Sequence, residues 1–397
     1  MSTSGYFTYN MRTVVHSGAD SIIKVPSLFR GLGGKRVLLV SDEGLEKAGL
    51  VNRVKDVFTL NNGPDMQLVG VYAKVTPDAG SESINDLVAY ARSVAADSIL
   101  ALGGGSVLDA AKGLKYCLHH HLTDICDILK LGLKLETWPE AKPSMIPHIA
   151  IPTTAGTGAE VTNGAVIHNQ VLNIKSLVLA PYLDADMAVL DAKLTLGLPK
   201  SITVATAFDA LTHAIESIAS PKANLFSDAH AITAAKVINE NMPKVAKEPT
   251  NVDCRSKLLQ ASTMACNAVV NAFSAFPVHN FSHALGATFH IPHGDANGIM
   301  LPVVIETLAD FYLPNAQRMA DALSLDSKGL NAEQTLAKVV AHIRGIQRAC
   351  DFDGSLKRFG VTEINLKEAI ASVKHDVLYI LYPVPEPVIE MILRKAL

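Results

Sequence analysis

The chain has 397 residues, 49% of them hydrophobic and 18% charged, a globular composition with enough apolar material for two domains. Lys and Arg (35) nearly balance Asp and Glu (38), for a formal net charge of −3. Because neither sign forms a long run and no secretory signal is visible at the N-terminus, we expect a cytoplasmic protein with no nucleic acid and no membrane among its partners.

The first half of the chain alternates short β-rich runs with amphipathic stretches. This pattern is typical of strands and helices wound around a parallel sheet. The first strong strand ends at Asp42, and a later one runs directly into Gly103. We predict strands at 36–42, 66–75, 98–102, 148–151 and 187–190, and helices at 43–58 and 82–96.

The second half changes character after Pro199, where long helical periodicities replace the β-branched runs. We therefore predict an α/β domain at residues 1–195 and an α-helical domain at 196–397. The expected fold is an N-terminal dinucleotide-binding domain with a Rossmann-like parallel sheet, followed by an all-α C-terminal domain.

The glycines that follow the predicted strand at 98–102 suggest an anion site. Gly103, Gly104 and Gly105 with Ser106 open a helix, so bare backbone N–H groups would face a diphosphate. A flexible turn is the simpler alternative, since the sequence is not G-x-G-x-x-G. Ser106 could cap the helix or donate to a phosphate oxygen.

Asp42 stands where an acidic side chain could accept hydrogen bonds from ribose hydroxyls and repel a 2′-phosphate, which favours NAD over NADP. It could equally be a helix N-cap. A second loop rich in Gly and Thr, Pro152 to Glu160, could line a nucleotide or could be only a loop. Lys175 is a cation available for a pyrophosphate, although a lone lysine is usually solvated.

Five residues of the second half form a candidate metal site. Asp209 and His213 are four residues apart in a helical stretch, as are His279 and His283, and His293 lies between Pro292 and Gly294 on a predicted turn. One carboxylate with several imidazoles suits Fe(II), Zn(II) or a similar ion. Spacing alone does not say which of the five are ligands.

Two other groups of potential ligands receive a simpler interpretation. The five cysteines are scattered without a C-x-x-C pair, so we expect buried, reduced thiols and no thiolate zinc site. The run His119-His120-His121 lies in a polar stretch without a carboxylate at helical spacing, so we expect it to be exposed.

With these motifs in hand, the sequence resembles the iron-containing, or group III, alcohol dehydrogenase family over nearly its whole length. The resemblance rests on four motifs in the family's order: Gly103-Gly-Gly-Ser-Val-Leu-Asp-Ala-Ala-Lys112, Pro152-Thr-Thr-Ala-Gly-Thr-Gly-Ala-Glu160, Asp209-Ala-Leu-Thr-His-Ala-Ile-Glu216, and His279-Asn-Phe-Ser-His-Ala-Leu-Gly286 followed by Pro292-His-Gly294. It implies a dehydroquinate synthase-like architecture.

The resemblance also implies roles for individual residues. Asp209, His213, His279 and His293 match the metal ligands, whereas His283 matches a proton-relay histidine that does not bind the metal. The cofactor NAD would contact Asp42, Thr76, Gly103, Gly104, Gly105, Ser106, Asp109, Thr153, Thr154, Thr157 and Lys175. Thr76 stands where an Asn is frequent, which weakens that one contact.

Two segments depart from the family pattern, at Val269 to Pro277 and at Leu381 to Pro385, and both are expected to border the substrate pocket. The implied activity is NAD-dependent and divalent-metal-dependent oxidation of a small primary alcohol, diol or hydroxy acid, or reduction of the matching aldehyde or ketone. The ion would be Fe²⁺, with Zn²⁺ or another divalent ion as alternatives. Hydroxyacid–oxoacid transhydrogenation is an alternative reaction on the same scaffold, and we expect a homodimer or larger homo-oligomer.

Overall fold

The computed structural model describes residues 6–60 and 66–397, so residues 1–5 and 61–65 of the predicted N-terminal domain lie outside it. The described residues form two compact units. The α/β unit comprises residues 11–60, 66–154 and 158–197, and the helical unit comprises residues 6–10, 155–157 and 198–397.

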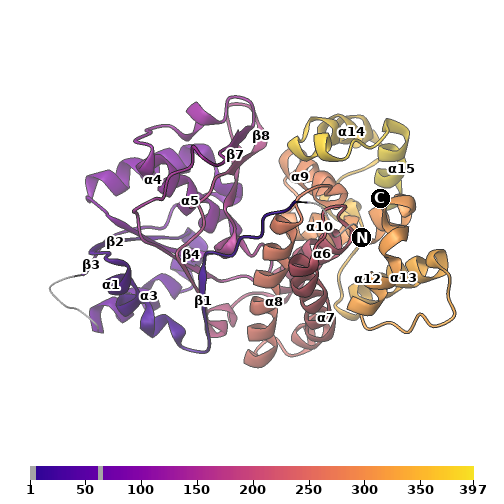
Figure 1. Cartoon of the computed structure of the whole chain (residues 1–397), viewed down its shortest axis with the longest axis horizontal. Helices are drawn as coiled ribbons and strands as arrows, with labels where there is room; N and C mark the ends of the chain where they lie inside the picture. Colours follow the sequence, from indigo (N-terminus) through magenta and orange to yellow (C-terminus); the bar gives the residue numbers. More distant parts are fainter. Residues whose placement is uncertain (1–5, 61–65) are drawn as a thin grey trace. The chain divides into compact units, whose positions relative to one another are not determined.

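A parallel sheet of six strands forms the centre of the α/β unit (Figure 1). The strand order is β1-β9-β6-β4-β2-β3, and every neighbouring pair is parallel. This confirms the predicted fold class. The strands are β1 Val14–Ser17, β2 Arg36–Val40, β3 Gln67–Tyr72, β4 Ser98–Gly103, β6 His148–Pro152 and β9 Met187–Leu190.

Alternation of side chains along the central strands gives the sheet two apolar faces. Val37 and Leu39 of β2 join the cluster that includes Leu100 and Leu102 of β4, whereas Leu38 and Ile99 join the cluster on the opposite face. Helices α1 and α3 cover one face, and α4 and α5 cover the other (Figure 1). Burial on both faces explains why these strands are continuous apolar runs.

The helices of this unit are α1 Val25–Leu32, α2 Glu43–Lys47, α3 Leu50–Leu60, α4 Ser81–Ser93 and α5 Gly105–His119. The single helix predicted at 43–58 is wrong in one respect, because the chain breaks there into α2 and α3. Gly49 has a φ of 79° at the break, a left-handed conformation that ends one helix before the next begins.

A second, three-stranded sheet in the α/β unit was not predicted. Its order is β5-β8-β7, with β5 Leu133–Leu135, β7 Gly164–Asn169 and β8 Ile174–Leu179. β7 and β8 form an antiparallel hairpin, and β8 carries Lys175. β5 pairs with β8 in parallel.

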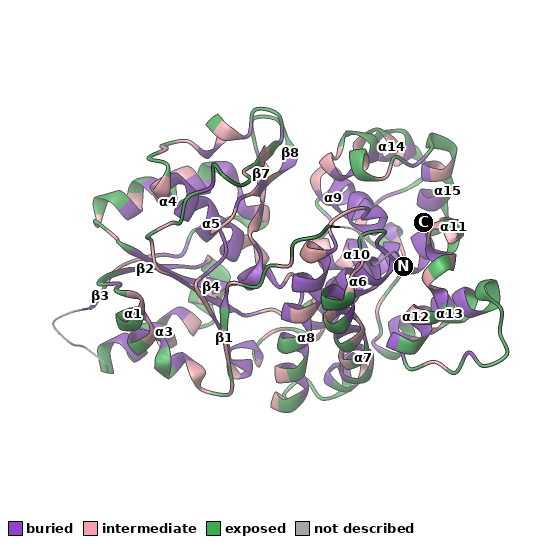
Figure 2. Cartoon of the chain, in the orientation of Figure 1, coloured by how far each residue is buried: buried purple, intermediate pink, exposed green. Residues whose placement is uncertain are grey.

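The helical unit is built around one large apolar cluster, whose buried helix faces are visible in Figure 2. Its long central helix, α6, has 16 buried residues among its 20. The helices are α6 Lys200–Ala219, α7 Leu225–Lys247, α8 Val252–Asn271, α9 Pro277–Phe289, α10 His293–Thr307, α11 Ala309–Tyr312, α12 Ala316–Ala322, α13 Ala332–Ala349, α14 Leu366–His375 and α15 Glu386–Ala396.

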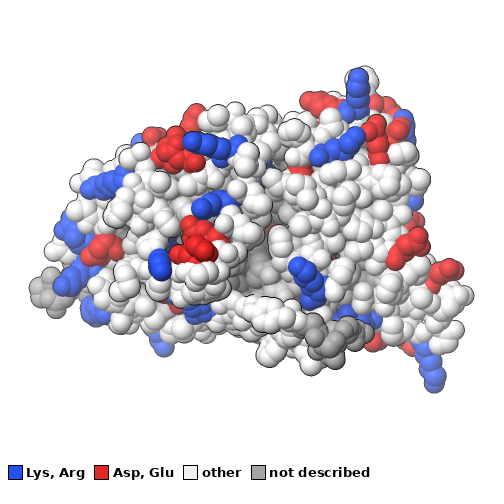
Figure 3. All heavy atoms as spheres, turned by 45° about the horizontal axis from the view of Figure 1, so that its top comes forward, with Lys and Arg blue, Asp and Glu red and all other residues white. Residues whose placement is uncertain are grey.

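Charge and hydropathy add two observations. On the face drawn in Figure 3, Lys and Arg are interspersed with Asp and Glu. Within residues 6–60 and 66–397, no single helix has the length and apolar character of a membrane span. Only the pair His293–Thr307 and Ala309–Ala322, bent by 91°, meets both criteria when taken together.

Candidate functional site

Helix α6 supplies the first two residues of the candidate metal site. Asp209 and His213 lie one turn apart on its buried side, where Asp209 is 3% and His213 is 7% exposed. The Nε2 atom of His213 lies 4.0 Å from Oδ1 of Asp209. The helical spacing recognised in the sequence therefore brings both side chains to one place.

Helices α9 and α10 bring two more imidazoles to the same carboxylate oxygen. Nε2 of His279 lies 3.6 Å, and Nε2 of His293 lies 3.4 Å, from Oδ1 of Asp209. His293 is the first residue of α10 and not part of a turn, so that prediction was wrong: Pro292 acts as the N-cap and its fixed φ starts the helix.

The arrangement fits a divalent cation. One ligand atom each from Asp209, His213 and His279 lies within 4.8 Å of the others, and the Nε2 atom of His293 points at the same oxygen. Nε2 of His279 is buried without a hydrogen-bond partner among the described residues. One carboxylate with three imidazoles is a donor set for Fe(II) or Zn(II).

Burial and mutual charge perturb the pKa values in this cluster. Burial would raise the pKa of Asp209, but the neighbouring His213 and His293 hold it well below its ordinary value. Desolvation lowers the pKa of His213 to about 3. For His279, burial would lower the pKa, but Glu216 and Asp209 together outweigh it and raise the pKa to about 9. Such opposed shifts are common at functional sites.

Two buried polar residues that sequence reasoning missed complete the surroundings. Nδ2 of Asn297 donates to Oδ1 of Asp209 at 2.8 Å and lies 3.1 Å from Nε2 of His293. Glu216 contacts His279 directly. Helical spacing could have indicated both residues. Glu216 follows His213 by three residues and Asn297 follows His293 by four, so each shares a helix face with a candidate ligand.

His283 lies beside these residues, in α9. Its ring centroid is 5.3 Å from that of His293 and 6.2 Å from that of His279, and its Nδ1 is 3.6 Å from Oδ2 of Asp376. Neither His283 nor His293 is among the three residues whose ligand atoms converge within 4.8 Å, but of these two only His293 lies within 4.0 Å of Oδ1 of Asp209. The geometry is compatible with a neighbour of the metal that does not bind it.

Of the two segments that depart from the family pattern, residues 269–277 lie close to this cluster. Phe276 makes an edge contact with the ring of His279, with 6.4 Å between centroids, and packs 4.9 Å from Phe273. Both belong to a small apolar cluster that also contains Val269 and Leu378. Residues near 270 and residues near 378 therefore share one apolar cluster beside a candidate metal ligand.

In the α/β unit, the candidate cofactor residues gather at the carboxyl ends of three adjacent strands. Asp42 follows β2, Gly104 follows β4, and Thr153 lies at the end of β6, where Gly103 and Pro152 are paired in register. The chain goes from β2 to β3 on one side and returns to β4 on the other. Such a switch point is where open α/β sheets bind nucleotides.

The glycine loop has the predicted strand-to-helix form. β4 ends at Gly103, Gly104 is the N-cap, and α5 begins at Gly105. A Cβ on Gly103 would lie 2.4 Å from the Cβ of Val107, so only glycine fits. Asp42 caps α2 by accepting a hydrogen bond from the N–H of Leu45 at 2.9 Å. Its contact with a ribose remains a prediction.

Ser106 does not cap the helix. Its Oγ instead accepts a hydrogen bond from the N–H of Asp78 at 3.0 Å. The carboxylate of Asp78 pairs with Nζ of Lys175 at 2.9 Å, so the lysine is buried and paired rather than solvated. Thr76, two residues away, donates to Ser83 at 3.2 Å. The short segment from Thr76 to Asp78 therefore brings together three of the predicted cofactor residues: Thr76, Ser106 and Lys175.

Three further predicted cofactor residues occupy different surroundings. Both carboxylate oxygens of Asp109 have partners within the unit, Nζ of Lys112 at 3.1 Å and the N–H of Val166 at 3.0 Å. The Oγ1 atom of Thr154 lies close to Gly104, 3.3 Å from the place that a Cβ would take if that glycine had one. Thr157 belongs to the helical unit. Their contacts with a cofactor remain predictions.

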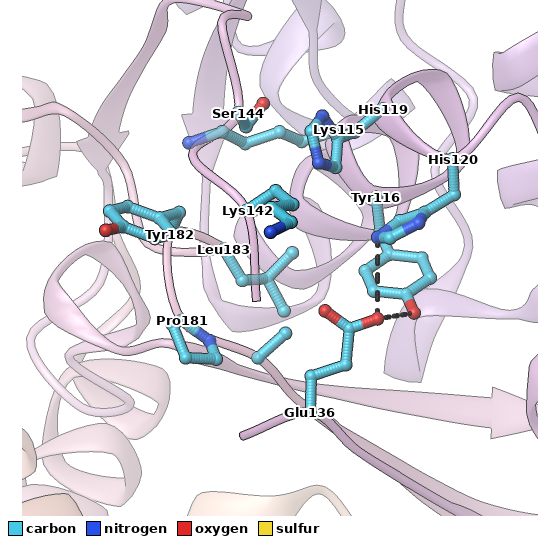
Figure 4. Close-up of a pocket in the computed structure, with 11 residues that line it drawn as sticks. Lys115, Tyr116, His119, His120, Glu136, Lys142, Ser144, Pro181, Tyr182 and Leu183 are labelled. Carbon is cyan, nitrogen blue, oxygen red and sulfur yellow. Dashed lines mark hydrogen bonds and ion pairs between the residues drawn. The ribbon is translucent and has the colours of Figure 1, made fainter. Parts of the chain in front are cut away.

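A small pocket in the α/β unit involves none of these residues (Figure 4). The hydroxyl of Tyr116 donates to the carboxylate of Glu136, and Nε2 of His120 lies 3.5 Å from the same group. His119 is half-buried, whereas His120 and His121 are exposed as predicted. Of the five cysteines, four are buried and Cys126 is half-buried.

Comparison with known proteins agrees with this geometry. The sequence model of the family described as iron-containing alcohol dehydrogenase matches residues 12–192, and that of the family's C-terminal domain matches residues 203–395. The chain belongs to the iron-containing alcohol dehydrogenase family. It is therefore an enzyme of the alcohol dehydrogenase class, an oxidoreductase that acts on CH–OH groups.

Relatives of this iron-containing dehydrogenase extend over most of the chain. Long-chain-alcohol dehydrogenase 1 of Geobacillus thermodenitrificans is 32% identical over 89% of this chain and 86% of its own length. A crystal structure of 1,3-propanediol oxidoreductase superposes with a TM-score of 0.89 at 28% identity, covering 99% of this chain and 100% of that one.

Sulfoacetaldehyde reductase from Bifidobacterium kashiwanohense, solved in complex with NAD+, has a TM-score of 0.81 at 23% identity and covers 99% of each chain. At that identity the likeness concerns the fold.

Proposed function

We propose that the chain is an NAD-dependent, divalent-metal-dependent alcohol dehydrogenase and aldehyde reductase, with the ion held by Asp209, His213, His279 and His293. The observation that carries the proposal is the convergence of three imidazole Nε2 atoms within 4.0 Å of one carboxylate oxygen. The family name favours iron, and the same donor set suits zinc.

The ion would act as a Lewis acid toward the oxygen of the alcohol or carbonyl group. The four ligand side chains would hold it on a rigid frame, since all come from helices. His283 would hold and release the proton that accompanies hydride transfer, and Asp376 beside its Nδ1 would orient the ring.

The proposal of NAD as cofactor rests on the α/β unit. The N-terminus of α5, with Gly104 and Gly105, offers backbone N–H groups to a diphosphate. Asp42 at the end of the neighbouring strand would accept hydrogen bonds from ribose hydroxyls and repel a 2′-phosphate. Lys175 and Ser106 would supply further donors beside this loop.

For substrate, we propose a small primary alcohol, diol or hydroxy acid and its aldehyde or ketone. The apolar cluster with Phe273 and Phe276 beside His279 favours an alkyl chain on the carbon that reacts. Two of the three similar proteins named above carry names for a long-chain alcohol and for 1,3-propanediol, so these names do not decide the chain length of the substrate.

Anaerobic purification with metal analysis, followed by NAD-coupled assays on short alcohols, diols and hydroxy acids, tests the function. We expect about one divalent ion per chain and steady NADH release. Retention of NADH through turnover would instead favour the transhydrogenase reaction.

A matched pair of histidine variants tests the site. His293→Ala should lower activity and metal affinity by at least about 100-fold. His290→Ala, which removes an exposed histidine three residues earlier, should leave both unchanged. Full metal content in the His293 variant would contradict the ligand assignment.

We also propose a cytoplasmic location, a homodimer or larger homo-oligomer, and separate domains at residues 1–195 and 196–397. The two compact units, which divide near residue 197, support the last of these. The first two rest on the sequence alone.

A further inference from the structure

Glu216 is a fully buried carboxylate with a specific connection to the proposed metal site. It lies on α6 seven residues after Asp209 and three after His213, and it is 0% exposed. A carboxylate in such a place loses its hydration, and only close partners offset that loss. The contacts of the Glu216 carboxylate therefore indicate its role.

Both oxygens of Glu216 contact the beginning of α9. Oε1 accepts a hydrogen bond from the backbone N–H of Val278 at 2.6 Å. Oε2 forms a very short contact with Nδ1 of His279. One side chain of α6 thus fixes both the first turn of α9 and the ring of the histidine that follows.

The contact with Nδ1 decides how the imidazole of His279 can act. When the imidazole binds a metal it must be neutral and carry one N–H, and a carboxylate at Nδ1 draws that proton to its own side. Nε2 is then left with a lone pair, and this is the atom 3.6 Å from Oδ1 of Asp209. The ring is therefore held in the tautomer and orientation that a ligand requires.

The charge of Glu216 has a second consequence. A divalent cation bound by one carboxylate and three neutral imidazoles would leave a single positive charge inside the protein. Glu216, which contacts the ligand His279, adds a second negative charge. The charges of the ion, Asp209 and Glu216 then sum to zero. An apolar or amide side chain of similar size would lack this effect.

We propose that Glu216 is a positioning residue of the metal site, which presents Nε2 of His279 to the divalent ion and neutralises the remaining charge. The inference rests on the proposed function, because it concerns the same ion. The proposal predicts that metal affinity depends on Glu216, although this residue does not touch the metal.

The variant Glu216→Gln tests this with little change of shape. If the amide oxygen accepts from Val278, the amide NH₂ faces Nδ1 of His279 and forces the proton onto Nε2, where it blocks coordination. If the amide turns round, its NH₂ opposes the N–H of Val278. Either orientation spoils one of the two contacts.

The measurement is the affinity of the metal-free protein for Zn²⁺ and Co²⁺, by competition with a chelator. We expect the affinity of the Glu216→Gln variant to be about 10- to 100-fold lower than that of the wild type. Asp228→Asn is the matched control, because it removes another buried charge of the helical unit, paired with Arg318. Its metal affinity should equal that of the wild type.

The outcomes separate the two proposals. If the wild type binds no divalent ion, the proposed function fails. If the wild type binds the ion and Glu216→Gln binds it equally well, the function stands and the role of Glu216 is overturned. Should Glu216→Gln not fold, Glu216→Asp keeps the charge but withdraws it by one methylene. Unchanged affinity in that variant would equally overturn the proposal.

Discussion

At the scale of single residues, the chain buries several charged groups whose positions were not evident from sequence. Lys115 of α5 is 1% exposed, and its Nζ donates to the carbonyl of Asp184 at 2.8 Å. Its nearest carboxylate, that of Asp186, is 3.9 Å away. Burial therefore outweighs the attraction of this carboxylate and lowers the pKa of Lys115 to about 8.

This shift predicts a pH-dependent stability. Between about pH 8 and 10.5, unfolding takes up a proton on Lys115, so its contribution to stability rises with pH across that window. Compared with Lys115→Met, the wild type should gain up to about 3 kcal/mol in the free energy of unfolding from pH 7.5 to 10.5. Urea titrations of both proteins at several pH values measure the difference. A constant difference would contradict the shifted pKa.

At the scale of elements, the packing of α10 against α6 holds His293 in place. A Cβ on Gly294 would lie 2.5 Å from the carbonyl oxygen of Ala205, which is backbone and does not rotate away. A side chain at this position would therefore force the two helices apart next to a candidate ligand.

Gly294→Ala should accordingly lower the free energy of unfolding by about 1–3 kcal/mol and weaken metal binding. Gly31→Ala is the matched control, because it makes the same change in a helix where nothing lies within 4 Å. That control should be neutral or stabilising by up to about 1 kcal/mol, because alanine favours helix. Thermal denaturation with metal analysis distinguishes the two variants. If Gly294→Ala had the stability and metal content of the wild type, α10 and α6 would have to accommodate the added methyl group without cost.

The segment between β3 and α4 affects the proposed diphosphate site through Asp78. Its carboxylate neutralises Lys175 beside Ser106, in a place where a cofactor diphosphate would bring more negative charge. Asp78→Asn removes this opposition and leaves the lysine charge available. If the diphosphate binds here, the carboxylate of Asp78 would weaken its binding.

We expect Asp78→Asn to lower the Kd for NADH about 5-fold at low ionic strength, with a smaller effect in high salt. Asp86→Asn makes the same change of charge at an exposed position of α4 and should leave the Kd unaltered. Fluorescence titration of NADH gives both values. Weaker binding in Asp78→Asn would mean that the carboxylate positions Lys175 more than it competes with the ligand.

At the scale of the whole molecule, the two units should respond to different ligands. A divalent ion would stabilise the helical unit, and NADH would stabilise the α/β unit, each by about 3–4 kcal/mol when present at 100 to 1,000 times its Kd. Calorimetry should therefore show a transition that a chelator lowers and another that NADH raises. A single transition that both treatments shift equally would argue against separate domains.

Strong local patterns made much of this architecture predictable. The buried strands before Gly103 and at 187–190 were apparent because continuous apolar runs end at turn residues. The sheet with β5, β7 and β8 was missed because β5 has only three residues, and because buried and half-buried positions interrupt each other in β7 and β8 instead of forming continuous apolar runs. Asp209 and His213 were paired by helical spacing, whereas the contact of Glu216 with His279 joins residues 63 positions apart, beyond any local pattern.

The helix α6 has a consequence for how the site assembles during folding. Asp209, His213 and Glu216 share this one helix, so half of the polar surroundings of the ion form locally. The other half arrives only when α9 and α10 dock, after chain closures of more than 60 residues. A helix that carries two ligands binds an ion weakly by itself. We therefore expect the ion to be captured late, by a chain whose apolar core has already collapsed.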